Sequence, residues 1–175
     1  METKNLKILY PKETIQERVT ALAGQIYQDY QPEEVLVVGA LKGAFVFLSD
    51  LVRELKLPLI IDFVRLSSYG SSTTSSGTVK ILKDLETSIT GKNVIVVEDI
   101  IDTGLTIKFL KDEFTKRQPR SLKICTLIDK KFRRQVKIDA DYAGITMDRD
   151  CFIVGYGLDW AENYRQLPDI YSIEP

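Results

Sequence analysis

One stretch decides the fold: Val94-Ile95-Val96-Val97-Glu98-Asp99-Ile100-Ile101-Asp102-Thr103-Gly104-Leu105-Thr106. Its first four residues form an unbroken β-branched run, which is typical of a strand buried on both faces of a parallel sheet. We therefore expect Glu98 and Asp99 to lie at the carboxyl end of this strand, where open α/β sheets bind their ligands.

The turn after this strand predicts an anion site. It combines short polar side chains, a glycine that permits close approach to the backbone, and free N–H groups at the start of a helix, and its residues are Asp102, Thr103, Gly104 and Thr106. Such a helix start attracts phosphate, so the residues suit a phosphorylated, metal-chelated polyhydroxyl ligand. The alternative is a helix capped by Asp102, with Glu98 and Asp99 in solvated ion pairs. Three acids within five positions are more than capping needs.

Composition limits the class of protein. A chain of 175 residues with 44% hydrophobic content suits one domain, residues 1–175, with a real core. The 24 basic and 25 acidic residues leave a net charge of −1, so we expect neither a nucleic-acid nor a membrane partner. The first eleven residues lack an apolar signal core, and we expect a cytoplasmic protein.

The absence of histidine restricts the chemistry. It excludes histidine metal sites, Ser–His and Cys–His nucleophile pairs, and histidine proton relays. Proton transfer must then fall to carboxylates, lysine, tyrosine or water. Cys125 and Cys151 lie in apolar stretches and are expected to be small buried hydrophobic residues, not a disulfide or a nucleophile.

Alternating apolar periods predict an α/β fold with a Rossmann-like, mostly parallel sheet flanked by helices. We expect helices over residues 14–30, 42–55 and about 103–116, and strands over residues 35–38, 58–66, 78–82, 94–97 and 122–127, with a further strand from Phe152. Residues 67–78 are rich in serine and threonine and predict a mobile loop. It is either an inert hairpin loop or a lid, and Tyr69 favours the lid.

The stretch from Val94 to Thr106 closely resembles the phosphoribosyl-pyrophosphate motif of the type I phosphoribosyltransferases. The resemblance implies that family's fold, with a small hood over the base site contributed mainly by the C-terminal segment. It also implies that Glu98 and Asp99 meet the ribose hydroxyls. The loop that wraps the 5′-phosphate would consist of Asp102, Thr103, Gly104, Leu105 and Thr106. Leu105 stands where some relatives carry a basic residue.

A second motif, Leu41-Lys42-Gly43, is by itself a weak signal for an anion-binding turn, and a tight turn is the alternative. It is similar to the pyrophosphate loop of the hypoxanthine-guanine phosphoribosyltransferases, where the leucine–lysine peptide can be cis. Arg165 matches a pyrophosphate-contacting arginine of that family. Ser68 and Tyr69 match its mobile loop over the reaction centre.

The base site follows from the same resemblance. Lys130 resembles the lysine that hydrogen-bonds the exocyclic oxygen of a 6-oxopurine, whereas Lys131, Arg133 and Arg134 are expected to form an ordinary solvated charge run. In the stretch 152–159, the Phe152 ring would stack on the purine and the Ile153 backbone would read its edge. Asp159 matches an acid of the base site that helps to hold magnesium with pyrophosphate.

Together these motifs imply a purine salvage enzyme that transfers the phosphoribosyl group from phosphoribosyl pyrophosphate to hypoxanthine or guanine, giving IMP or GMP and pyrophosphate. Mg²⁺ would be the cofactor, held near Glu98, Asp99 and Asp159, because this hard cation prefers oxygen ligands. Asp102 would accept a proton from the purine ring. Relatives usually assemble as homodimers or homotetramers.

Two other functions remain open from the sequence. One is a regulator of the same fold that binds nucleotide and RNA, although the balanced charge gives no basic face. The other is a phosphoribosyltransferase for xanthine or a pyrimidine, because one exocyclic group depends on a few hydrogen bonds.

Overall fold

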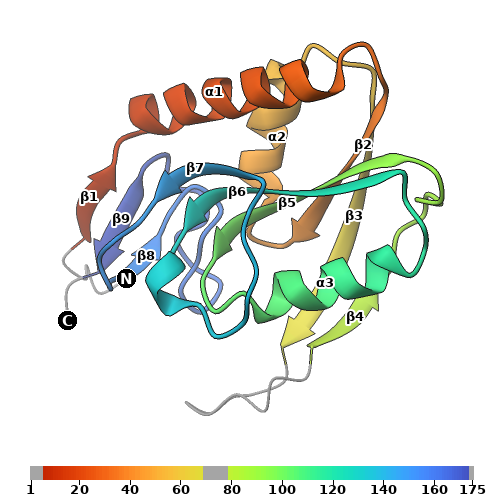
Figure 1. Cartoon of the computed structure of the whole chain (residues 1–175). Helices are drawn as coiled ribbons and strands as arrows, with labels where there is room; N and C mark the ends of the chain where they lie inside the picture. The colour runs from red at the N-terminus through yellow and green to blue at the C-terminus, as the bar shows by residue number, and fades with distance from the viewer. Residues whose placement is uncertain (1–5, 69–78, 174–175) are drawn as a thin grey trace.

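The computed structural model of the chain describes residues 6–68 and 79–173. These residues form two sheets and three α-helices (Figure 1). In spatial order the main sheet consists of β4 (Val79–Lys83), β3 (Leu59–Ser68), β2 (Val35–Leu41), β5 (Asn93–Ile101), β6 (Ser121–Asp129) and β7 (Tyr142–Thr146). Only the β3–β4 pairing of this sheet is antiparallel, so the predicted mostly parallel α/β sheet is confirmed.

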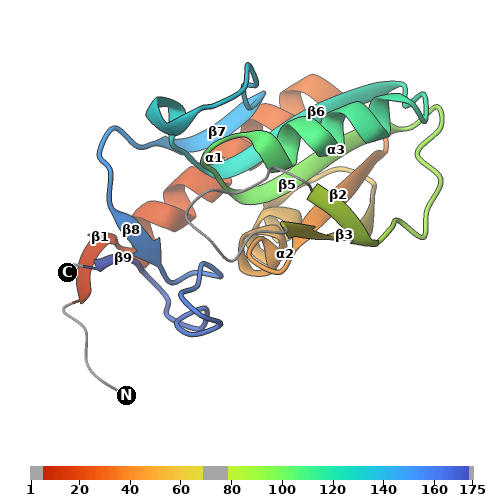
Figure 2. The same ribbon diagram turned by 90° about the horizontal axis from the view of Figure 1, so that it is seen from below.

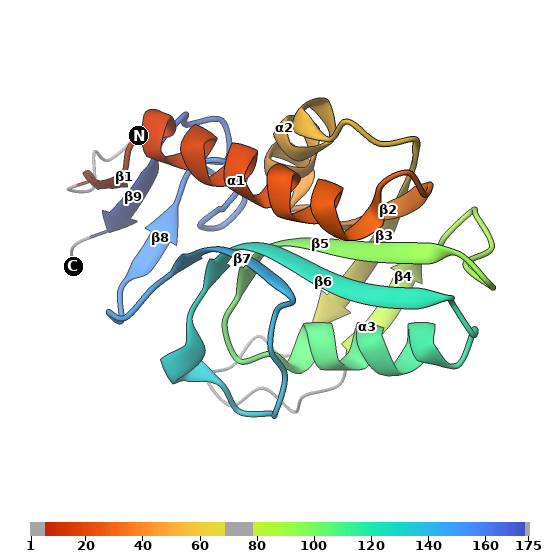
Figure 3. The same cartoon turned by 45° about the horizontal axis from the view of Figure 1, so that its top comes forward.

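The helices cover both faces of the main sheet, with α1 (Lys12–Tyr30) and α2 (Phe45–Glu54) on one face and α3 (Leu105–Thr115) on the other (Figure 3). The β-branched run of β5 shows why the main sheet needs helices on both of its faces. Ile95 and Val97 pack into the core below α1 and α2, whereas Val94 and Val96 pack into the core below α3. A strand that buries both of its faces must be apolar at every position.

A second, small sheet consists of β1 (Leu6–Tyr10), β9 (Ile170–Ile173) and β8 (Phe152–Val154), all antiparallel. We call it the small sheet, and it lies beside the main sheet (Figure 2). Two of its strands come from the C-terminal segment and β1 comes from the start of the chain. A short 3-10 turn at Lys131–Arg133 lies between β6 and β7.

The strand order places a topological switch point between β2 and β5. The chain leaves β2 through α2 towards β3, and it leaves β5 through α3 towards β6 on the other side. Because the two connections diverge, a crevice opens at the carboxyl ends of β2 and β5, and ligands of open α/β sheets bind at such a point. Lys42 and Asp102 directly follow these two strands.

Several boundaries differ from those predicted. The strand expected over 94–97 continues to Ile101 because it stays paired with β6 as far as Asp129. Glu98 and Asp99 therefore lie within the last residues of β5 and not after it. Helix α2 begins at Phe45, three residues after the expected start. The short strands β1, β7 and β9 were not predicted.

The expected mobile loop lies mostly outside the described residues. Ser67 and Ser68 extend β3 and pair with Lys80 and Val79 of β4, and Tyr69 belongs to the part of the chain that is not described. Among the helices that are described, none is long and apolar enough to cross a membrane.

Candidate active site

Two adjacent carboxyl groups lie at the switch point. Asp99 is buried, and its Oδ1 accepts a hydrogen bond of 2.9 Å from the Ile100 N–H. Glu98 Oε2 is also buried and has no hydrogen-bond partner among the described residues. Burial raises the pKa of Glu98 well above its ordinary value, and the neighbouring Asp99 carboxylate raises it further. Burial also raises the pKa of Asp99. An adjacent acid pair with an unused oxygen suits hydroxyl donors or a cation.

The Leu41-Lys42-Gly43 loop lies directly against this acid pair. A Cβ atom on Gly43 would fall 1.8 Å from Asp99 Oδ2, so only glycine fits at this position. On its other side, a Cβ atom on Gly157 would fall 2.2 Å from the Gly43 carbonyl oxygen. The Leu41–Lys42 peptide bond is cis. Gly43 is therefore the point at which the loops after β2 and β8 meet the end of β5.

The loop after β8 brings cations to the same place. The Arg165 guanidinium donates to the Gly157 carbonyl over 2.7 Å and pairs with Asp159 at 2.8 Å. Lys42 Nζ donates to Glu162 over 2.9 Å, and Arg165 approaches the same carboxylate at 3.4 Å. The Lys42 hydrogen bond lowers the pKa of Glu162. Lys42 and Arg165, which come from motifs distant in the sequence, thus both contact the Glu162 carboxylate, and Asp159 pairs with Arg165 beside it.

Glu162 itself was not singled out as a site residue from the sequence. It lies in a loop where Ala161, Glu162 and Tyr164 have positive φ angles of 50°, 65° and 78°. No local sequence pattern predicts this backbone path. A charge count around Lys42 and Arg165 is the only signal that could have suggested it.

The turn after β5 presents backbone N–H groups at the start of α3. Gly104 has a φ of 83°, and a Cβ atom there would lie 2.5 Å from Ile138 Cγ2, so the turn needs glycine for both its conformation and its packing. Gly104 occupies the N-cap position and has no side chain to cap the helix, and the Leu105 N–H instead donates to Thr103 Oγ1 over 3.4 Å. Asp102 is therefore not a helix cap. Its Oδ1 instead accepts a 3.0 Å hydrogen bond from Arg133 Nε.

The prediction of a solvated charge run is wrong for Arg134. Arg133 is exposed, as expected, although it pairs with Asp102 and Asp150. Arg134 is only 12% exposed, forms an ion pair with the buried Asp129, and donates to the carbonyl oxygens of Ile101 and Asp102 over 2.8 and 2.6 Å. Carbonyl oxygens exposed by the turn need donors, and arginine supplies several from one planar group. Lys131 is exposed, as expected.

The expected base-site residues lie at the junction of the two sheets. Lys130 is 6% exposed and its Nζ donates to the Cys151 carbonyl over 2.8 Å, directly before Phe152. The Phe152 ring is 56% exposed and lies 5.8 Å from the ring of Trp160 at an interplanar angle of 57°. Ile153 is buried. An exposed aromatic face beside a lysine suits a flat polar heterocycle. Trp160 was missed because it lies in a loop, eight residues after its partner Phe152 in β8.

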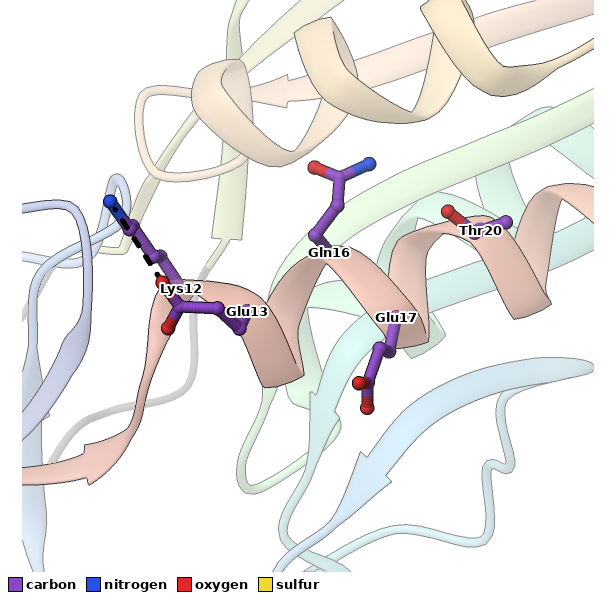
Figure 4. Close-up of a pocket in the computed structure, with 5 residues that line it drawn as sticks. All are labelled: Lys12, Glu13, Gln16, Glu17 and Thr20. Atoms are coloured by element: carbon purple, nitrogen blue, oxygen red, sulfur yellow. Dashed lines mark ion pairs between the residues drawn. The ribbon is translucent and has the colours of Figure 1, made fainter.

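Two features elsewhere in the described residues do not join this site. A hollow of 720 Å³ on the exposed surface of α1 is lined by Lys12, Glu13, Gln16, Glu17 and Thr20 (Figure 4), and none of these belongs to the loops above. The second feature is Cys125, which is free and buried, and burial raises the pKa of its thiol and makes it an inert core residue. Cys151, also free, is only partly buried and lies beside Lys130.

Within residues 6–68 and 79–173, no cluster of three acidic or cysteine side chains could hold a metal ion on its own. Mg²⁺ typically takes one or two carboxylates and completes its shell with water and substrate phosphate oxygens. The Glu98 and Asp99 pair, with the unpartnered Glu98 Oε2, fits that mode of binding.

Comparisons with known proteins point to one family. Residues 5–161 match the phosphoribosyl transferase domain. The chain is 49% identical over 172 residues to a hypoxanthine-guanine phosphoribosyltransferase of Aquifex aeolicus, covering 98% of this chain and 96% of that protein. A solved hypoxanthine-guanine phosphoribosyltransferase of Bacillus anthracis superposes with a TM-score of 0.91 at 53% identity, covering 96% and 98% of the two chains. A hypoxanthine phosphoribosyl transferase of Trypanosoma cruzi gives 0.92 at 38% identity, covering 100% and 94%.

Proposed function

The chain belongs to the phosphoribosyltransferase family, and we propose that it transfers the 5-phosphoribosyl group of phosphoribosyl pyrophosphate to hypoxanthine or guanine, giving IMP or GMP and pyrophosphate in purine salvage. The packing of Gly43 between Asp99 and Gly157 carries this proposal. It brings an anion loop, an acid pair and a cation-bearing loop to one crevice, with an exposed aromatic ring on the neighbouring strand.

The phosphoribosyl group would bind along the end of β5. Glu98 and Asp99 accept hydrogen bonds from the ribose hydroxyls, and the N–H groups at the start of α3 receive the 5′-phosphate. The phosphate loop consists of Asp102, Thr103, Gly104, Leu105 and Thr106. Since this loop carries no cation of its own, its affinity for phosphate depends on the backbone and on the hydroxyl groups of Thr103 and Thr106.

The leaving pyrophosphate would lie over the Leu41-Lys42-Gly43 loop, between Lys42 and Arg165. Mg²⁺ is the expected cofactor, with Glu98, Asp99 and Asp159 as the acids near it, and it supplies charge stabilisation to the departing pyrophosphate. Lys42 and Arg165 add two cations there, while Glu98 and Asp99 stabilise a ribosyl centre that develops positive charge. Glu162 must leave both cations when pyrophosphate binds.

The purine would stack on Phe152, with its edge along the Ile153 backbone and near Asp159 and its exocyclic oxygen near Lys130. An ammonium group has three donors and no acceptor, so a carbonyl is preferred to an amino group at this position. As the ring nitrogen attacks the ribosyl carbon, the bond to pyrophosphate breaks with its electron pair, and a proton of the purine passes to Asp102.

Three further parts of the proposal come from the family. The chain acts as one domain in which the small sheet is the hood. The chain assembles as a homodimer or homotetramer, for which the exposed side chains of Phe45 and Ile61 offer apolar surface. Two free thiols agree with a reducing cytoplasm.

The test is a nucleotide-formation assay with phosphoribosyl pyrophosphate, Mg²⁺ and, separately, hypoxanthine, guanine, xanthine, adenine and uracil. We expect turnover on hypoxanthine and guanine alone. Xanthine or uracil as the best substrate would change the substrate class, and silence on every base would favour a nucleotide-binding and RNA-binding regulator. Lys130→Gln should weaken the preference for 6-oxopurines over adenine. The control is Lys131→Gln, which changes the exposed neighbouring lysine and should leave this preference unchanged.

A further inference from the structure

Arg133 joins two parts of the site that are far apart in the sequence. Its Nε donates to Asp102 Oδ1 over 3.0 Å, and its Nη1 approaches the two carboxylate oxygens of Asp150 at 3.2 and 3.0 Å. Asp102 belongs to the phosphate loop after β5, and Asp150 lies two residues before Phe152 at the start of β8. One guanidinium therefore connects the proposed proton acceptor to the strand that carries the proposed stacking ring.

Stability does not explain this bridge. The side chains of Arg133, Asp102 and Asp150 are all partly exposed, and exposed ion pairs contribute little to folding. The turn is stabilised instead by Arg134, which donates hydrogen bonds to the carbonyl oxygens of Ile101 and Asp102. The two adjacent arginines thus contact different parts of Asp102: Arg134 donates to its backbone carbonyl, and Arg133 donates to its carboxylate.

Resting on the proposed function, we propose that Arg133 is a positioning residue for phosphoribosyl transfer. It holds the Asp102 carboxylate in one orientation and fixes its distance from Phe152. Arg133 uses only Oδ1, and a carboxylate has about four lone-pair sites, so Asp102 keeps capacity to accept the proton of the purine. The rigid fork of arginine reaches two carboxylates at once, and the single ammonium of lysine does this poorly.

Four variants test this role by separating kcat from KM. Arg133→Met removes the fork, Arg133→Lys keeps the charge, Asp150→Asn weakens the link to β8, and Lys131→Met is the matched control for loss of one exposed cation from the same turn. Arg133→Met should lower kcat about 10- to 100-fold, because small misplacements of a reacting group cost that much. The KM for phosphoribosyl pyrophosphate should stay near that of the wild type, since Arg134 still holds the phosphate loop.

The other variants localise the effect. Arg133→Lys should recover part of the lost kcat, Asp150→Asn should raise the KM for the base severalfold, and Lys131→Met should match the wild type. A wild-type kcat in Arg133→Met, or an equal loss in Lys131→Met, would overturn the positioning role. If the wild type itself makes no nucleotide, the proposed function fails and the positioning role fails with it. If the wild type makes nucleotide and Arg133→Met has the same kcat, the proposed function stands and only the positioning role is removed.

Discussion

Asp102 is the residue on which the proposed chemistry depends. Because the chain has no histidine, we propose that a carboxylate beside the base site accepts the proton of the purine. Asp102→Asn keeps the size of the side chain and a hydrogen-bond acceptor but removes the basic oxygen. We expect kcat to fall about 10²- to 10⁴-fold, with the KM for phosphoribosyl pyrophosphate little changed, in steady-state assays of nucleotide formation.

The control for this change is Asp112→Asn on the exposed side of α3, where Asp112 pairs only with Lys108 among the described residues. It should leave both constants unchanged. A kcat of Asp102→Asn equal to that of the wild type would remove Asp102 from the proton-accepting role.

Glu162 pairs with Lys42 and Arg165, the two cations that we propose bind pyrophosphate. Its carboxylate contacts Lys42 at 2.9 Å and Arg165 at 3.4 Å, so substrate must displace it. Glu162→Gln should lower the dissociation constant of pyrophosphate about two- to five-fold, a size typical of one exposed ion pair. Calorimetric titration measures this change, with Glu13→Gln on α1 as a control outside the site. Weaker binding by Glu162→Gln would show instead that Glu162 helps to hold the ligand.

At the residue scale, a local motif predicts where a candidate site residue lies relative to the strand ends. Asp102 and Lys130 directly follow β5 and β6, and Gly104 lies in the turn after β5, so the strand ends fix their place. The contacts of Arg133 with Asp102 and Asp150, and the contact of Glu162 with Lys42, could not be predicted, because each joins residues from different loops. Three-dimensional pairing, and not local pattern, decides whether a charged residue is solvated.

Among the elements, β5 shows which features of a strand are local. Its β-branched run fixes the existence and burial of the strand, but its end is fixed by pairing with β6 up to Ile101 and Asp129. Strands β1, β7 and β9 have four or five residues each and depend on their partners for existence. Local propensity is weakest for such short strands.

Strand β3 contains a buried acid that anchors a neighbouring loop. Asp62 is 5% exposed and accepts hydrogen bonds from the N–H groups of Phe63, Glu86 and Thr87 over 2.7, 2.9 and 2.8 Å. Burial alone would raise the pKa of Asp62, but these hydrogen bonds outweigh it and hold the pKa below its ordinary value of 3.8. Asp62→Asn should therefore lower the free energy of unfolding by about 2 kcal/mol at neutral pH.

The pH dependence of this loss follows from the lowered pKa. The stabilisation by the Asp62 carboxylate is complete above pH 3.8 and is lost as the pH falls below 3.8 through the folded-state pKa. Urea unfolding of the wild type and Asp62→Asn should give curves that differ at neutral pH and converge in acid. The control is Asp139→Asn at an exposed position, whose free energy of unfolding should match that of the wild type both at neutral pH and in acid. A difference that persisted in acid would exclude the charge as its cause.

In the whole molecule, the diverging connections of β2 and β5 create the site. The sequence predicted the alternation of strands and helices, but not that β2 lies between β3 and β5. That order places the Leu41-Lys42-Gly43 loop against Glu98 and Asp99, and the small sheet then brings Phe152 and Arg165 to the same crevice.

Size-exclusion chromatography with light scattering should show a dimer or tetramer, and a monomer at assay concentration would contradict the proposed assembly.

Transfer of the phosphoribosyl group is the central claim, and ³¹P NMR tests it most directly because it follows both phosphorus-containing products at once. With phosphoribosyl pyrophosphate, Mg²⁺ and hypoxanthine, we predict one pyrophosphate for each nucleotide 5′-phosphate formed, and neither product when the base is left out. Pyrophosphate released without nucleotide would indicate hydrolysis and not transfer. No change in the spectrum with hypoxanthine or guanine would contradict the account.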